Sequence, residues 1–140
     1  MLLLGLSYSA AVFGADGEGA PTGDRLQQLQ NAIIAAEESC QDPTAEAYRT
    51  NLPMAALQLK KAALSAASTW QATANGAGTY VDRGMEAIGR IEKGERYNAE
   101  PGKLSELAYF AQCDGAVQPY YVHLPTSYDA NRPWPLIVFL

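Results

Sequence analysis

Few residues of this 140-residue sequence have side chains and spacing suited to chemistry. The single histidine, His123, is a potential general base, and Glu37-Glu38 and Glu92 with Glu95 are neighbouring carboxylates that acid–base catalysis could use. Both carboxylate pairs fall in segments typical of solvated helix surfaces, so surface charge explains them without catalysis. His123 falls on the polar side of an alternating stretch and is expected to be a half-exposed strand residue.

Cysteine and glycine motifs supply the other candidates. Cys40 and Cys113 have neither zinc-site nor redox-pair spacing. In an exported protein they could form a disulfide between a helical and a strand region, and otherwise each is a small buried thiol. Gly76-Ala77-Gly78 lacks the third glycine of a dinucleotide-binding loop. We therefore assign no catalytic, cofactor-binding or metal-binding residue and expect no cofactor.

Composition excludes two classes of partner. The sequence is 48% hydrophobic with a net charge of −5, so we expect a packed core rather than disorder. No basic cluster exceeds the pair Lys60-Lys61. Nucleic-acid binding and electrostatic membrane anchoring both need a basic surface. We expect no nucleic-acid partner and no membrane anchor.

The first 23 residues differ from the rest. Residues 1–15 are apolar without a charge and finish in small residues, which predicts a signal peptide, and residues 16–23 read as a flexible tail. No Lys or Arg precedes the apolar run, so an N-terminal helix buried in the fold is the alternative. A signal peptide implies a secreted or periplasmic protein.

Residues 24–94 have helical periodicity and are expected to form an antiparallel helical extension. The first helix should run from Asp24, as N-cap, to Ser39, and the second from about Tyr48 to Trp70, with Pro53 dividing it. Asn75 to Gly78 should separate it from a third helix, which is capped by Thr79 with Asp82 and runs from about Tyr80 to Lys93. Gly94 is the expected left-handed stop. The apolar stripes fall at Leu26, Leu29, Ile33, Ile34, Ala36 and Cys40 in the first helix and at Val81, Met85, Ile88 and Ile91 in the third.

The periodicity changes after a polar linker, residues 95–104. Leu107 to Gln112 and Val117 to Leu124 read as two strands joined by Cys113-Asp114-Gly115, because Asp-Gly between apolar runs is a hairpin signal. The apolar run Leu136 to Leu140 predicts a third strand buried on both faces, as in a parallel sheet. Such a strand needs neighbours, so we expect residues 105–140 to be the opening of a larger, truncated domain.

Three segments in order resemble the opening of bacterial α/β-hydrolases, in the esterase and prolyl-oligopeptidase-like peptidase group. They are Asp114 to Pro125, then Tyr128-Asp129, then Trp134 to Leu140. The resemblance covers about residues 105–140. It implies acyl transfer by a serine in a Gly-x-Ser-x-Gly elbow, with an acid and then a histidine completing the triad, and an ester or peptide substrate for the full-length protein.

The sequence departs from that family pattern in one respect. It has no Gly-x-Ser-x-Gly, and the nearest match, Gly5-Leu6-Ser7-Tyr8-Ser9, lacks the last glycine. His123 precedes any nucleophile, so it does not fit the triad order. The predicted fold is α/β: a helical unit followed by the first three strands of an incomplete hydrolase sheet. The predicted function is the inactive N-terminal part of a secreted serine hydrolase, and a non-catalytic helical binding module is the alternative.

Overall fold

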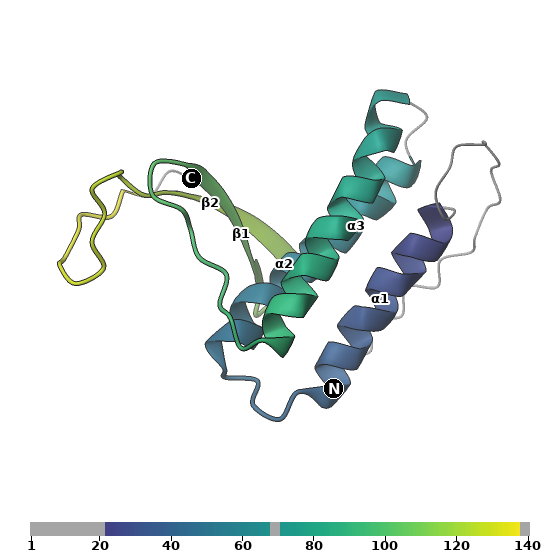
Figure 1. Cartoon of the computed structure of the whole chain (residues 1–140), viewed down its shortest axis with the longest axis horizontal. Helices are drawn as coiled ribbons and strands as arrows, with labels where there is room; N and C mark the ends of the chain where they lie inside the picture. The colour runs from purple at the N-terminus through teal and green to yellow at the C-terminus, as the bar shows by residue number, and fades with distance from the viewer. Residues whose placement is uncertain (1–21, 68–70, 138–140) are drawn as a thin grey trace.

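The computed structural model describes residues 22–67 and 71–137. Three helices, α1 (Thr22–Ser39), α2 (Glu46–Ala67) and α3 (Gln71–Glu92), are followed by strands β1 (Leu104–Phe110) and β2 (Val117–His123) (Figure 1). The strands pair antiparallel, with Leu104 opposite His123 and Phe110 opposite Val117. The described part of the chain is therefore a mixed α/β arrangement, a helical unit followed by a hairpin, as the sequence predicts.

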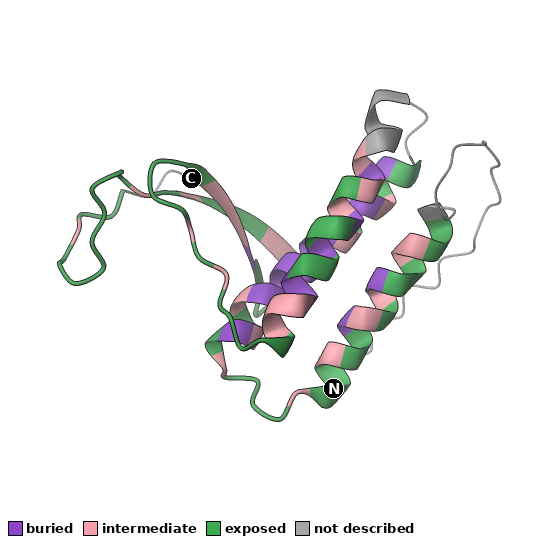
Figure 2. Ribbon diagram, in the orientation of Figure 1, coloured by how far each residue is buried: buried purple, intermediate pink, exposed green. Residues whose placement is uncertain are grey.

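Helix α2 lies at the centre of the fold. It packs against α1 and α3 on one side and against the hairpin on the other. Nearly every residue from Asn51 to Gln58 is consequently buried (Figure 2). Two-sided burial also explains why α2 lacks a single apolar stripe. The core gathered around it consists of Leu29, Ile33, Leu52, Met54, Ala55, Leu57, Ala62, Val81, Ala87, Ile88 and Ala108.

Helices α1 and α3 meet at a glycine. Leu29 is fully buried, and its side chain lies directly over Gly84. A Cβ at Gly84 would be 2.5 Å from Leu29 Cδ2, well inside van der Waals contact. The close approach of the two helices at this point therefore requires a residue without a side chain.

The predicted break at Asn75 to Gly78 is wrong, because α3 begins at Gln71 and continues through it. The predicted cap formed by Thr79 and Asp82 is wrong for the same reason. Ala77 is buried, and a Cβ at Gly76 would already touch Ser65 Oγ at 3.4 Å. Small residues here let α3 lie close to α2, and this packing offsets the low helix propensity of glycine.

Other helix predictions need smaller corrections. Pro53 lies inside a continuous α2 and does not divide it. Helix α1 begins at Thr22, so Asp24 lies in its first turn rather than at the N-cap, and residues 22–23 are helical instead of tail. Ile34 and Met85 are exposed, because the buried stripes of α1 and α3 are narrower than predicted.

The predicted stop at Gly94 is confirmed. Its φ is 69°, and the amide of Gly94 donates to the carbonyl of Ile91 at 3.0 Å. The amide of Glu95 donates to the carbonyl of Arg90 at 2.9 Å, which completes a Schellman motif. The linker that follows is held in place, because Asn51 Nδ2 donates to the carbonyl of Glu95 at 2.7 Å.

The hairpin turn also follows the sequence prediction. Gly115 has a φ of 69°, and its amide donates to the carbonyl of Ala111 at 2.8 Å. Asp114 Oδ1 accepts from the amide of Ala116 at 2.9 Å. Strand β1 starts at Leu104, slightly earlier than expected. The Asp-Gly pair thus closes the hairpin in two ways: Gly115 adopts the positive φ, and the Asp114 side chain accepts a hydrogen bond from the backbone.

The predicted third strand is not confirmed. Leu136 and Ile137 lie outside any strand and are 86% and 72% exposed, and the remainder of that run lies outside the described residues. Before it, residues 125–135 form a loop that extends away from the helices (Figure 1). Trp134 Nε1 donates to the carbonyl of Asp129 at 2.8 Å and holds the loop closed.

Candidate functional site

The residues with potential acid–base chemistry do not come together. The His123 side chain is exposed at the end of β2 and forms no hydrogen bond with any described residue. Glu37 and Glu38 are exposed on the last turns of α1, and Glu92 and Glu95 are exposed at the end of α3. These positions agree with the surface-charge interpretation, and His123 is more exposed than predicted.

The cysteine and glycine motifs are likewise separate. Cys40 and Cys113 are both free thiols, the first half-buried after α1 and the second exposed in the hairpin turn. Gly76 to Gly78 lie within α3, so they form no phosphate-binding loop. The serine motif at residues 5–9 lies outside the described residues. Within residues 22–67 and 71–137, no group of three potential metal ligands occurs.

An ion pair joins the helical unit to the hairpin. Lys61 Nζ of α2 donates to Glu106 Oε1 of β1 at 2.5 Å, and Tyr121 Oη of β2 donates to the same oxygen at 2.9 Å. The Lys61 and Glu106 side chains are 30% and 18% exposed. Lys61 Nζ also lies 5.8 Å from the centre of the Tyr80 ring.

These contacts set the charge state of the junction. Burial acts to raise the pKa of Glu106, but hydrogen bonds from Lys61, Tyr121 and Gln58 outweigh it, so the pKa is lowered. The hydrogen bond to Glu106 raises the pKa of Tyr121. The pairing therefore favours an ionised carboxylate and a protonated phenol. Because the Glu106 carboxylate already accepts hydrogen bonds from several neighbours, it is suited to holding α2 and the hairpin together rather than to proton transfer.

A polar cleft of about 400 Å³ lies beside this junction. Its walls come from α2, α3, the linker and β1. Gln58, a residue with a buried side chain, lines it together with Glu106. The other lining residues are Met54, Arg83, Glu86, Ala87, Arg90, Tyr97, Glu100, Lys103, Leu104 and Ser105.

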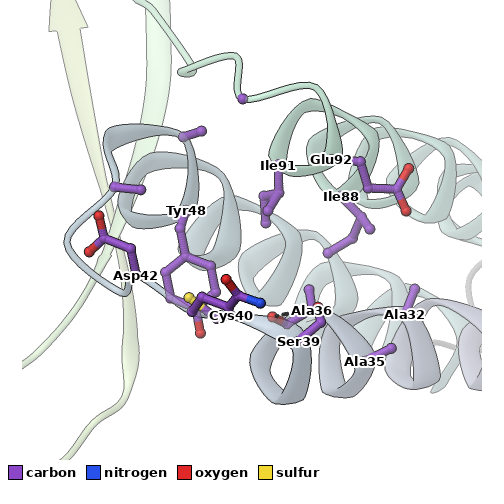
Figure 3. Close-up of a pocket in the computed structure, with 14 residues that line it drawn as sticks. Ala32, Ala35, Ala36, Ser39, Cys40, Asp42, Tyr48, Ile88, Ile91 and Glu92 are labelled. Carbon is purple, nitrogen blue, oxygen red and sulfur yellow. Dashed lines mark hydrogen bonds between the residues drawn. The ribbon is translucent and has the colours of Figure 1, made fainter.

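A second, apolar cavity of about 510 Å³ lies where the end of α1 meets α2 and α3 (Figure 3). Ala32 and Ala36 line one side, and Ile88 and Ile91 face them from α3. Burial raises the pKa of the Tyr48 phenol at its end, and the neighbouring Cys40 and Glu37 side chains add to that effect. The cavity can accept an apolar group, and its aliphatic lining offers no catalytic arrangement.

Sequence reasoning missed the polar residues of α2. Asn51 and Gln58 are seven residues apart on one face, and both are buried. Asn51 Oδ1 and Gln58 Oε1 are buried without a hydrogen-bond partner in the described part of the chain. The signal was a pair of amides at helical spacing in an otherwise apolar segment.

Comparisons with known proteins identify no relative. No protein-family model matches the chain, and neither a curated protein nor a solved structure does. Among the helices of the described residues, none is long and apolar enough to cross a membrane.

Proposed function

We propose that this chain is the N-terminal part of a secreted serine hydrolase that acts on carboxylic esters, with peptide bonds as the other substrate class. The observation that carries the proposal is the order of segments. The β1–β2 hairpin leads through Leu124-Pro125 into the Tyr128-Asp129 loop and then into the apolar run from Trp134. This is the order that the resemblance to α/β-hydrolases implies.

The loop geometry fits that role. Asp129 holds the loop from two sides, since its Oδ1 accepts from the amide of Asn131 at 2.9 Å and its carbonyl accepts from Trp134. Arg132 lies 4.1 Å from the centre of the Trp134 ring and Tyr128 packs against the same ring. The residue at the start of the apolar run, Trp134, is thereby held against the preceding Tyr128-Asp129 segment.

The face of the hairpin that α2 does not cover also fits the proposal. Ala108 and Phe110 face the core on the α2 side, whereas Tyr109 and Tyr120 are exposed on the other side, with ring centres 6.0 Å apart. An apolar sheet face without cover is suited to packing against further structure. In this proposal residues 22–137 form a scaffold, and the Ser-Asp-His triad belongs to other parts of the protein.

Labelling with a fluorophosphonate, which reacts with activated serines, tests the proposal on the protein from its native source. We expect the labelled polypeptide to yield peptides from residues 104–132, and its mature N-terminus to lie near residue 16. A polypeptide with those peptides that stays unlabelled, in a sample where a known serine hydrolase is labelled, would contradict the proposal.

The alternative is a helical binding module, and the apolar cavity between α1, α2 and α3 is the observation that favours it. A module of this kind needs no serine chemistry. Absence of label, together with saturable binding of an apolar probe such as 1-anilinonaphthalene-8-sulfonate that Ile88→Asp abolishes, would favour this reading over the hydrolase.

A further inference from the structure

The polar cleft beside the Lys61–Glu106 junction contains a buried hydrogen-bond acceptor with no partner. Gln58 is 2% exposed, and its amide nitrogen is engaged because its side chain hydrogen-bonds to Glu106. Its Oε1 is buried without a hydrogen bond from any described residue. Leaving such an atom unpaired costs roughly 1–3 kcal/mol, so buried acceptors in folded proteins are nearly always satisfied. This oxygen therefore lacks a donor.

The rim of the same cleft carries a cation without a partner. Its other charged residues are paired: Arg90 with Glu86 at 2.8 Å, Lys103 with Glu100, and Glu106 with Lys61. Arg83 forms no ion pair or hydrogen bond with any described residue. The cleft thus offers one free guanidinium and one free acceptor, with no free carboxylate opposite the guanidinium.

Apolar surface lies in the cleft as well. Met54, Ala87 and Leu104 line it together with Gln58 and Arg83. Its volume, about 400 Å³, lies in the range of small-molecule sites, roughly 300–1,000 Å³. The cleft therefore presents an unpaired guanidinium, an unpaired acceptor and apolar surface. A ligand that matches all three has a carboxylate, a nearby N–H donor and a short aliphatic body.

We propose that this cleft binds a small aliphatic α-amino acid. The Arg83 guanidinium donates to the ligand's carboxylate, whose geometry it matches, and the ligand's ammonium group donates to Gln58 Oε1. The aliphatic side chain lies against Met54 and Leu104. The site is separate from the serine chemistry proposed above and does not depend on it.

Access to Gln58 requires a small movement. Its Oε1 exposes less than 1 Å² of surface, so a donor reaches it only when a lining side chain shifts. Met54 lies one helical turn before Gln58 on α2, and its unbranched thioether chain adopts new rotamers easily. Binding therefore includes a rearrangement of Met54 and should broaden or shift its methyl signal.

Titration calorimetry with three matched probes tests the site on the full 140-residue chain. The probes are L-leucine, L-leucinamide, which lacks the carboxylate, and 4-methylpentanoate, which lacks the amine. We expect saturable binding of leucine, with each analogue about tenfold weaker or more, since each loses one charge-assisted hydrogen bond. No saturable binding of leucine at millimolar concentration, or equal binding of all three probes, would overturn the proposal.

Variants locate the site. Arg83→Ala should weaken leucine about tenfold and remove the preference for leucine over leucinamide. Gln58→Leu should remove the preference for leucine over 4-methylpentanoate. Arg49→Ala is the matched control, because Arg49 is also an exposed arginine whose side chain pairs with no described residue, and it does not line the cleft. Equal effects of Arg83→Ala and Arg49→Ala would show that binding reflects only the overall charge of the protein and would overturn the proposal. Because the Arg83 side chain is exposed, the Arg83→Ala variant should fold normally.

Discussion

The helical unit and the hairpin bury their apolar residues in different ways. In the helical unit, α2 is enclosed by neighbours and most large apolar side chains of the core lie around it. The hairpin is covered by α2 on one face and leaves Tyr109, Tyr120 and Tyr121 exposed. The helical unit therefore supplies most of the stability, and the hairpin depends on a small contact with α2. Two-stranded sheets need such support, because an isolated hairpin is marginal in water.

The largest expected effect of a single substitution lies in the helical core. Leu29→Ala should lower the free energy of unfolding by about 2–5 kcal/mol, since it empties a fully buried site between α1 and α3. Urea unfolding followed by circular dichroism at 222 nm measures it. Leu64→Ala is the control, because Leu64 is 66% exposed and should change stability by only about 0.5 kcal/mol. Similar losses for both variants would show that the helical unit has no well-packed core.

Gly84 should give the next largest effect. Gly84→Ala places a methyl group 2.5 Å from Leu29 Cδ2, and overpacking of this kind costs about 1–3 kcal/mol. Gly89→Ala, where a Cβ meets nothing within 4 Å, should instead stabilise α3 by up to about 1 kcal/mol. The double variant Leu29→Ala with Gly84→Ala should lose less free energy of unfolding than the sum of the losses in the two single variants. Strict additivity would mean that α1 and α3 do not meet at this point.

The junction between the two regions should respond to pH. Glu106→Ala should cost roughly 1–2 kcal/mol at pH 7, because Lys61 and Tyr121 lose their shared acceptor. The pKa of Glu106 lies below its ordinary value of 4.5, so its contribution is complete above that pH and is lost as the pH falls through the lowered pKa.

Unfolding measured at pH 7 and near pH 3 tests this. Wild type should lose more stability than Glu106→Ala between the two pH values. Lys103→Ala is the comparison variant, because it breaks the exposed pair with Glu100 and leaves the junction intact. Equal pH dependence of wild type and Glu106→Ala would show that the junction carries no charge-dependent stability.

The most local effect is expected at the hairpin turn. Gly115→Ala forces a side chain into a φ of 69°, which costs about 1–2 kcal/mol. Amide hydrogen exchange should rise in β1 and β2 while the amides of α1 and α3 stay protected. Equal increases in the helices would show that the two regions unfold as one unit.

The sequence predicts the positions of the local structures well. Apolar periodicity places α1 and the later half of α3, and Gly94 and Asp114-Gly115 mark a helix end and a hairpin turn through backbone rules that act within a few residues. The errors come from tertiary packing. Gly76 and Gly78 lie inside α3 because close contact with neighbouring helices compensates for their low propensity.

The candidate site was harder to predict for a related reason. Gln58 and Arg83 lie on different helices, and only the packing of α2 against α3 and the hairpin brings them to one cleft. A polar residue inside an apolar helix segment signals a buried acceptor, but its partners depend on long-range contacts. Catalytic motifs have local signatures that a sequence displays. A site assembled from single residues on separate elements has none.

The contacts between the linker or hairpin and α2 also determine the order of folding. Lys61 and Glu106 are separated by 45 positions in the sequence. Thr50 and Tyr97 are separated by 47, and the Thr50 hydroxyl accepts from the amide of Tyr97 at 3.0 Å. The turns of the helices and of the hairpin close over short loops, which form rapidly, whereas these contacts require the chain between them to be folded back first. The hairpin should therefore dock after the barrier has been crossed. Removing Glu106 should then accelerate unfolding and leave the refolding rate nearly unchanged.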